Sequence, residues 1–413
     1  MTAASTNRSP RRPTGLGPGL MRLRTESSSH RSLTIVVAMA LTTALMYVLP
    51  LIPPLSVVQP PGPWYDSFAN AGVFVLLAMG LNVVIGMAGL LDLGYAAFFA
   101  IGAYTYAYSN SPFAGTDFPF FPMLFVGAAV AAIFGILLGA PTLRLRGDYL
   151  AIMTLGFGEI VPIVFLNLDR FTRGTNGIGG IFRPEPLPVL GPFSAISPFN
   201  YFLVMAVIVT ITMILMYRLA DSRIGRAWNA IREDELAAAA NGINTVTTKL
   251  LAFSLGATTS GLAGVFNASK LTIVSPDQFL FTVSFTVLAM VILGGMGNIW
   301  GVAVGAFVVY NIQAVVLKRI NGVIETVGIP AFDLGPLHVD LAKVPFVEYQ
   351  FLLYGIALVL MMLLRPEGLF PNQRRRLELH VEEDLDGEDG GDGEIKGSLG
   401  ATPGAGEELG AKA

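Results

Sequence analysis

The sequence predicts an all-α polytopic integral membrane protein with about ten transmembrane helices. Of its 413 residues, 53% are hydrophobic and 13% are charged, whereas soluble domains average about 25% charged residues. Ten apolar stretches have roughly the 17 to 25 residues that a helix needs to cross a bilayer. The three histidines lie outside these stretches, and cysteine is absent. Intramembrane haem, zinc and thiol chemistry therefore has no candidate residues.

The candidate spans follow one another at short intervals. The second and third spans are close together, as are the eighth and ninth, so re-entrant or broken helices are an alternative to clean crossings there. The arginine-rich start resembles a signal peptide, but the first apolar stretch approaches a full crossing and lacks a small-residue cleavage site, so we expect an anchored helix. The spans are expected at residues 33–52, 68–87, 90–109, 121–140, 149–168, 199–219, 249–267, 279–296, 299–317 and 347–364.

Basic residues cluster at both ends of the chain and in the loops near residues 144–146 and 218–249. Basic loops stay in the cytoplasm, and an even number of crossings places both termini on one side, so we expect both termini to be cytoplasmic. The basic residues of two longer external loops, 169–198 and 318–346, are the exceptions to this pattern.

The two ends of the chain are expected to be disordered cytoplasmic tails flanking a transmembrane domain, residues 31–371. Residues 1–30 are rich in Arg, Ser, Pro and Gly, and the tail 372–413 carries 11 acidic and 5 basic residues. Neither has enough apolar side chains to form a core. A partner-binding role for the acidic tail is the alternative.

The most polar interior segment is residues 218–249, which lies between two membrane-length apolar runs. It is expected to form one short amphipathic helix with Trp228 and Ile231 on its apolar face. The Asn-Gly pair ending at Gly242 is expected to stop that helix. The alanines from 237 to 240 combine high helix propensity with small side chains, which suits a helix that enters a groove. An ordinary cytoplasmic loop is the alternative.

Six motifs follow one another between residues 71 and 371: GLLDLGYAAFFAIGAY, RLRGDYLAIMTLGFGEI, TNGIGGI, GRAWNAIREDELAAAANGI, LAMVILGGMGNIWG and RPEGLFP. In this order they resemble the permease subunits of bacterial ATP-binding-cassette (ABC) importers for branched-chain amino acids, the LivM-type family. The resemblance implies the ABC importer permease fold in the bacterial cytoplasmic (inner) membrane. Residues 31–371 would be the permease domain and residues 218–249 its coupling loop.

The resemblance also implies partners in a larger assembly. These are a second homologous permease subunit, two cytoplasmic ABC ATPase subunits and an extracytoplasmic solute-binding protein, with the lipid bilayer around them and no nucleic acid. ATP and magnesium would bind the ATPase subunits and no cofactor would bind this chain, which would not be an enzyme. The sequence agrees in having no GxxxxGK[ST] phosphate-binding loop.

In ABC importers a loop with an EAA-x3-G pattern forms the coupling helix that seats in the ATPase. Here Ala237, Ala238 and Gly242 match this pattern, whereas Leu236 replaces its glutamate and Glu235 stands one residue early. A large side chain at Ala238 or Gly242 is therefore expected to uncouple ATP hydrolysis from uptake. The residues expected to couple to the ATPase are Arg223, Gly225, Arg226, Trp228, Arg232, Glu233, Asp234, Glu235, Ala237, Ala238 and Gly242.

Two carboxylates, Asp92 and Glu159, fall within candidate spans. A charge near the bilayer centre costs at least about 2.5 kcal/mol, so each is expected to face protein or water. Glu159 is expected either to line the translocation path or a gate, or to make a structural hydrogen bond. Asp92 lies near the end of its span and is expected to be interfacial, with a path role as the alternative.

Other polar and glycine positions are candidates for helix packing or for the translocation path. Asn82 is expected to pack helices together, and the Gly294-Gly295 cluster either packs helices or interrupts one. Asn176 lies in a glycine-rich external loop, which is a plain connection or a gate or binding-protein contact. The residues assigned to the path or gate are Asn82, Asp92, Gly156, Gly158, Glu159, Asn176, Gly294 and Gly295.

The substrate and the energy source have alternatives as well. Branched-chain amino acids fit the resemblance best, and related permeases carry urea, amides or other amino acids. An ion-coupled secondary transporter would need a clearer titratable site than Asp92 and Glu159 provide. An intramembrane enzyme would need a motif such as GxSxG or HExxH, and neither occurs.

Overall fold

The computed structural model describes residues 31–52, 61–142, 145, 147–186, 191–194, 198–318, 332–334, 337–339, 348–365 and 368–370. The two predicted tails, and most of the loop predicted at residues 318–346, lie outside these residues.

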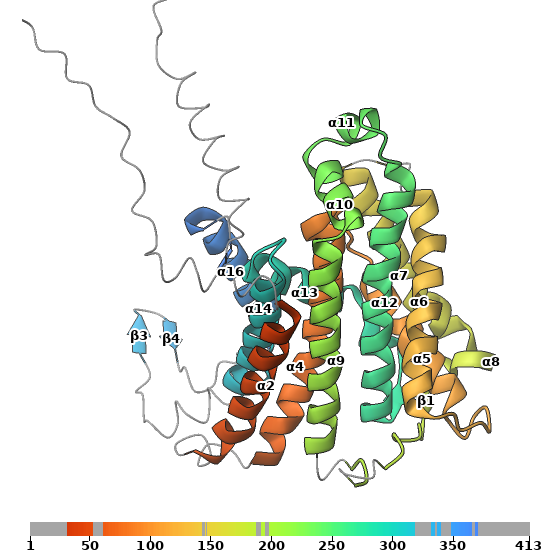
Figure 1. The fold of residues 1–413 in the computed structure, drawn as a ribbon. Helices are drawn as coiled ribbons and strands as arrows, with labels where there is room; N and C mark the ends of the chain where they lie inside the picture. Colours follow the sequence, from red (N-terminus) through yellow and green to blue (C-terminus); the bar gives the residue numbers. More distant parts are fainter. Residues whose placement is uncertain are drawn as a thin grey trace, which may run out of the picture. The chain divides into compact units, whose positions relative to one another are not determined.

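Long apolar helices build a bundle (Figure 1). In the described part of the chain, seven helices have the length and hydropathy to cross a membrane, and two shorter apolar stretches accompany them. The chain is thus a mainly helical polytopic membrane protein. The α-helices are α2 (Arg31–Val48), α4 (Pro61–Asn82), α5 (Ala96–Ser109), α6 (Phe120–Thr142), α7 (Asp148–Asn167), α8 (Asp169–Thr172), α9 (Phe199–Ala220), α10 (Arg223–Glu233), α11 (Glu235–Ala240), α12 (Thr245–Leu271), α13 (Phe281–Gly294), α14 (Ile299–Asn311) and α16 (Gln350–Leu364).

Short elements connect these helices. Among the described residues, β1 pairs with β2 and β3 pairs with β4, both antiparallel. The short helical turns are η1 (Leu49–Leu51), η2 (Val83–Met87), η3 (Gly174–Asn176), η4 (Pro276–Phe279) and η5 (Ile312–Leu317), and the strands are β1 (Ile178–Gly179), β2 (Ile273–Val274), β3 (Phe332–Leu334) and β4 (Leu337–Val339).

The chain between α4 and α5 is a broken crossing. After the π-helical turn η2, residues 88–95 are irregular, and α5 begins only at Ala96 and has 14 residues. A clean helix over residues 90–109 is therefore wrong, and the broken-helix alternative is confirmed. Gly89 has φ +70°, a backbone conformation that glycine adopts without strain, and it helps the chain leave helical geometry here.

Helix α12 forms the centre of the bundle and makes its most extensive contacts with α6, α5 and α4. Small residues permit this close packing. A Cβ on Gly264 would lie 2.6 Å from the backbone nitrogen of Ala103 in α5, and a Cβ on Gly261 would lie 2.7 Å from the carbonyl oxygen of Gly127 in α6. Lipid supplies no hydrophobic force between helices, so close contacts at glycine are what hold α12 between its neighbours.

The second glycine cluster joins α13 to α14. A Cβ on Gly294 would lie 2.7 Å from Cα of Val302, so these two helices pack at backbone contact distance. Gly295 (φ +105°) and Gly297 (φ +82°) form the tight turn between them. The close-packing interpretation of Gly294-Gly295 is confirmed, and the cluster separates two helices instead of interrupting one.

Two polar connections lie at opposite ends of α12 (Figure 1). Helices α10 and α11 precede its first residue, and β2 follows its last residue and pairs with β1 of the 169–198 connection. Residues 169–186 and 218–244 are therefore on opposite faces of the bundle.

Valine at Gly264 is expected to separate α12 from α5 and to lower the free energy of unfolding by about 1 to 3 kcal/mol, because side-chain atoms would overlap backbone. The measurement is thermal unfolding of the purified protein in detergent. Gly355→Val is the matched control, since a Cβ at Gly355 in α16 has nothing within 4 Å. Equal melting temperatures for the two variants would contradict the packing argument.

Candidate functional site

The polar segment between α9 and α12 folds as two helices, α10 and α11, which we call the hairpin (Figure 1). Ser222 begins α10 as its N-cap, because its hydroxyl accepts hydrogen bonds from the backbone N–H groups of Ile224 and Gly225, both at 3.2 Å. Gly225 is buried, and a Cβ there would overlap the carbonyl oxygens of Leu219 and Ala220. Glycine therefore allows α10 to turn tightly against the end of α9.

The hairpin bends at Asp234. The backbone of this residue is extended (φ −153°, ψ 112°), which ends α10. Its Oδ1 accepts hydrogen bonds from the N–H groups of Leu236 at 2.7 Å and Ala237 at 3.0 Å, so Asp234 is the N-cap of α11. The prediction of one continuous helix is wrong, because this capping aspartate stops one helix and starts the next.

The hairpin ends where the sequence predicts. Gly242 has φ +83°. The N–H of Ile243 donates to the carbonyl of Ala238 at 3.1 Å, and the N–H of Gly242 donates to the carbonyl of Ala239 at 3.0 Å. This is the Schellman arrangement that closes a helix at a left-handed glycine. The predicted stop at Asn241-Gly242 is confirmed.

One face of the hairpin is fixed to α12. Trp228 is 0% exposed, and its Nε1–H donates to the carbonyl of Thr248 at 2.7 Å. Glu235 forms an ion pair with Lys249 at 2.6 Å. Ala238 is also buried. These contacts fix the hairpin to the first turn of α12. Trp228, Glu235 and Ala238 therefore support the hairpin from its inner side and are not part of its exposed surface.

Arg232 also points inward. Its Nη1 donates to the carbonyl oxygen of Gly86 at 2.7 Å, which connects α10 to the π-helical turn η2. A hollow of about 250 Å³ lies beside this contact. The charged residues that line the hollow are Asp148, Arg232, Glu235 and Lys249.

The opposite face of the hairpin is open. Leu236 at the start of α11 is 70% exposed, and Ala237 beside it is also exposed. Arg226 is exposed, and its Nη1 donates to the carbonyl of Asp221 at 2.8 Å. In the sequence Leu236 is only a departure from the EAA pattern, and a six-residue helix is too short for its apolar pattern to predict that this leucine is exposed. The predicted coupling residues on the open face are Arg223, Arg226, Glu233, Asp234, Ala237 and Gly242.

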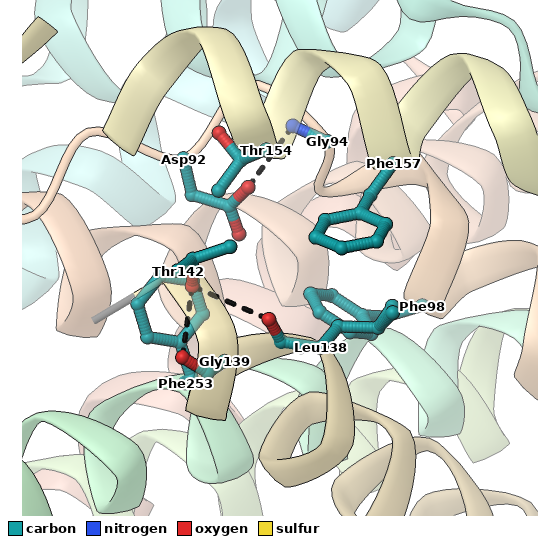
Figure 2. A pocket seen from close by; sticks show the side chains of 9 residues that line it. All are labelled: Asp92, Gly94, Phe98, Leu138, Gly139, Thr142, Thr154, Phe157 and Phe253. Atoms are coloured by element: carbon teal, nitrogen blue, oxygen red, sulfur yellow. Dashed lines mark hydrogen bonds between the residues drawn. The ribbon is translucent and has the colours of Figure 1, made fainter. Parts of the chain in front are cut away.

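Asp92 lies inside the bundle in the irregular segment between η2 and α5 (Figure 2). It is 2% exposed, so it faces protein, as expected for a carboxylate in an apolar stretch. One carboxylate oxygen accepts from the N–H of Gly94 at 2.9 Å, and the other has no hydrogen-bond partner among the described residues. The carboxylate borders a cavity of about 10 Å³, the space of one water molecule. The cavity is lined by Asp92, Gly94, Phe98, Leu138, Gly139, Thr142, Thr154, Phe157 and Phe253.

The irregular segment around Asp92 is hydrogen bonded to α7. The N–H of Leu93 donates to Oγ1 of Thr154 at 3.0 Å. Gly158, one turn further along α7, packs against Gly94, since a Cβ on Gly158 would lie 2.8 Å from Cα of Gly94. Gly158 therefore serves the contact between the broken crossing and α7.

Glu159 is exposed on the opposite side of α7, near the middle of the helix. Gly156 lies one turn before it, and a Cβ on Gly156 would have nothing within 4 Å. Ile152 and Ile163 on the same face are also exposed. Glu159 thus sits beside a notch in an otherwise apolar surface that faces away from the bundle.

The remaining predicted path residues are separate from this face. Asn82 is buried, and its Oδ1 accepts from the N–H of Gly297 at 2.8 Å, so its role in helix packing is confirmed. Asn176 is exposed in η3, at the end of the bundle opposite the hairpin. Among the described residues, no group of three or more His, Asp or Glu side chains could hold a metal ion.

The apolar bundle defines a multi-pass membrane protein with a polar hairpin fixed at one end. Residues 65–362 match the family model described as branched-chain amino acid transport system / permease component. The match covers well over half of the sequence, and the chain belongs to this family of transport permeases.

Individual relatives agree with this membership. The chain is 38% identical over 326 residues to the high-affinity branched-chain amino acid transport system permease protein LivM of Escherichia coli (strain K12), covering 74% of this chain and 70% of that protein. It is 25% identical to the probable branched-chain amino acid transport permease protein LivM of Methanocaldococcus jannaschii (73% and 91% covered). It is 26% identical to the permease protein LivH of Escherichia coli (strain K12) (59% and 82% covered). No solved structure matches the chain.

Valine at Gly242 is expected to fray the hairpin, because a left-handed backbone costs a side-chain-bearing residue about 1 to 2 kcal/mol. Asparagine tolerates this conformation better, so Gly242→Asn is the control. The measurement is hydrogen exchange of the peptide that spans residues 235–248. Exchange should be faster in the valine variant than in the asparagine variant, and identical exchange would show that the turn does not hold α11 in place.

Proposed function

We propose that this chain is the membrane-spanning permease subunit of an ABC importer that carries branched-chain amino acids into the cell. The hairpin carries the proposal: it is fixed by Trp228 and Glu235 on one face and presents Leu236 and Ala237 on the other. A rigid projection with exposed apolar residues could seat in a groove of an ATPase subunit and transmit its movement to the membrane domain. ATP and magnesium would bind two partner ATPase subunits, and this chain would have no enzymatic role.

The proposed topology has ten crossings with both termini and the hairpin in the cytoplasm of a bacterial cell, the crossing at residues 88–109 being broken. Contacts at the two ends of the bundle support it. The hydroxyl of Tyr65 at the start of α4 donates to the carbonyl of Tyr47 at the end of α2, so these helices run in opposite directions. After α16, the carbonyl of Phe370 accepts from the side chain of Asn298, which lies in the turn beside Gly297 and hence near the hairpin's end of α4.

The proposed passage lies along the exposed face of α7 and is shared with a second homologous permease subunit. A glutamate near mid-helix is costly against lipid, so Glu159 requires protein or water beyond this chain. The notch at Gly156 allows another helix or a solute to come close. The similarity of this chain to both LivM and LivH, each named as a permease protein of a branched-chain amino acid system, supports a homologous partner.

The proposed contact for an extracytoplasmic solute-binding protein is the loop that carries Asn176. This loop is held in place rather than trailing from the bundle. Ile178 and Gly179 pair with β2, and the guanidinium of Arg173 lies 4.8 Å from the ring centroid of Phe113. Asn176 is therefore displayed at a fixed position on the face opposite the hairpin. Urea, amides or other amino acids are alternative substrates, and an ion-coupled transporter is the alternative of another class.

Uptake of radiolabelled leucine by vesicles that contain the whole complex is expected to require both ATP and the solute-binding protein. Collapse of the proton and sodium gradients should leave it unchanged, because ATP hydrolysis by the partner subunits would supply the energy for transport. The measurement compares initial rates with and without ATP, binding protein and ionophore. Uptake that follows an ion gradient without ATP would select the secondary transporter.

Tryptophan at Ala237 is expected to reduce leucine uptake per ATP hydrolysed by about tenfold, since a large side chain on the open face would block docking into a groove. Ala237 is the suitable position because Ala238 is buried, and a change there would disturb the hairpin itself. Ala129→Trp, on an exposed position of α6, is the control. Normal coupling in the Ala237 variant would remove the hairpin from the mechanism.

A further inference from the structure

Arg232 connects the hairpin to the segment in which the helix after α4 loses its regular hydrogen bonding. Its guanidinium donates to the carbonyl of Gly86, which lies in the π-helical turn η2. Such π-helical turns are rare and occur frequently at functional sites. The contact therefore joins the proposed docking element to an unusual piece of backbone.

The carbonyl of Gly86 is available because the backbone N–H that would normally bind it is used elsewhere. In an α-helix the N–H of Leu90 would donate to Gly86, four residues earlier. Here the N–H of Leu90 donates to the carbonyl of Val84 at 3.0 Å, and that of Ala88 donates to Val83 at 3.1 Å. Arg232 takes the place of the missing donor with a charge-assisted hydrogen bond, which is stronger than the bond it replaces.

Glycine at position 89 makes room for this arginine. A Cβ on Gly89 would lie 2.9 Å from Cγ of Arg232, and the backbone at Gly89 has φ +70°. Both facts require a residue without a side chain at this position. The aliphatic part of Arg232 thus lies directly against the backbone of the broken crossing.

The segment that follows Gly89 leads to the proposed passage. The N–H of Leu93 donates to Thr154 on α7, and Glu159 lies further along that helix. A shift of residues 88–95 would therefore change the position of α7. The contacts run continuously from the hairpin through Arg232 and the irregular segment to the helix that presents Glu159.

We propose that Arg232 is a positioning residue that transmits hairpin movement into the bundle by holding η2 in its π-helical register. The proposal rests on the coupling function proposed above. When Arg232 moves away, the carbonyl of Gly86 can accept a hydrogen bond from the N–H of Leu90. The α-helix then extends by this bond, and residues 88–95 shift with it. Coupling between distant sites requires a two-state element of this kind, and η2 supplies it.

The first test uses the full chain in proteoliposomes with its second permease subunit, ATPases and binding protein, and radiolabelled leucine as the probe. Arg232→Met keeps the aliphatic stem and removes the donors, whereas Arg232→Lys keeps one cationic donor. We expect the methionine variant to lower leucine uptake per ATP hydrolysed about tenfold with the complex assembled in normal amounts, and lysine to restore part of that ratio.

A second readout separates transmission from a structural contact. The chain has no cysteine, so single-cysteine reporters are specific. Leu91→Cys in the irregular segment and Leu236→Cys on the hairpin occupy positions that are 39% and 70% exposed. The maleimide labelling rate at both should change on ATP binding in the wild-type background. In Arg232→Met the response should persist at position 236 and disappear at position 91.

Two outcomes overturn the inference. One is normal uptake per ATP in Arg232→Met; the other is less assembled complex with an unchanged ratio, which a purely structural contact would give. Failure of the proposed function gives a different result, because Ala237→Trp would then stay coupled and position 236 would not respond to ATP even with Arg232 present.

Discussion

The structure depends on satisfying the polar backbone that the broken crossing at residues 83–95 exposes inside the bundle. In hydrocarbon each unpaired N–H or C=O costs several kcal/mol, so irregular backbone persists only where protein supplies partners. Here those partners come from three different helices. Arg232 of α10 binds the carbonyl of Gly86, Thr154 of α7 binds the N–H of Leu93, and Ser284 of α13 binds the N–H of Ala96. A contact in the other direction adds to these, because the hydroxyl of Tyr95 donates to the carbonyl of Gly256 in α12.

Because its partners lie on separate helices, the conformation of the broken crossing depends on the relative positions of those helices. Glycine-mediated contacts bring α12 close to α5 and α6, and the same α12 carries the hairpin on its first turn through Thr248 and Lys249. The hairpin thus reaches the interior by two routes, along α12 as a rigid unit and through Arg232 into η2. The second route is the shorter. It ends at the backbone of η2, where the carbonyl of Gly86 could alternatively accept a hydrogen bond from the N–H of Leu90.

Much of the fold could be predicted because it depends on local patterns. Apolar runs of crossing length gave the positions of most helices, and the left-handed glycine at 242 follows from the short range of a helix stop signal. The spacing of Trp228 and Ile231 likewise gave the buried face of α10. These features need only the few residues around them.

The features that the sequence did not give depend on contacts between distant parts of the chain. Arg232 and Gly86 are 146 residues apart, and their contact exists only because η2 has π-helical geometry. The sequence places Asp92 near the end of an apolar run but does not reveal that the helix is interrupted there. The capping role of Asp234 was not predicted, because the polar segment was expected to form one continuous helix.

The burial of the helices indicates that one chain does not complete the proposed passage. Among the described helices, 83% of the most apolar window of α4 and η2 is buried within this chain, compared with 28% for α7. An apolar helix exposed to lipid needs no partner, but α7 carries a glutamate on that surface beside a glycine notch. A second membrane subunit against this face would remove the cost of the carboxylate and enclose the space next to it. The irregular segment is bound to the other face of α7, which would then form a wall of the passage. A movement that starts at the hairpin and shifts this segment would therefore move that wall.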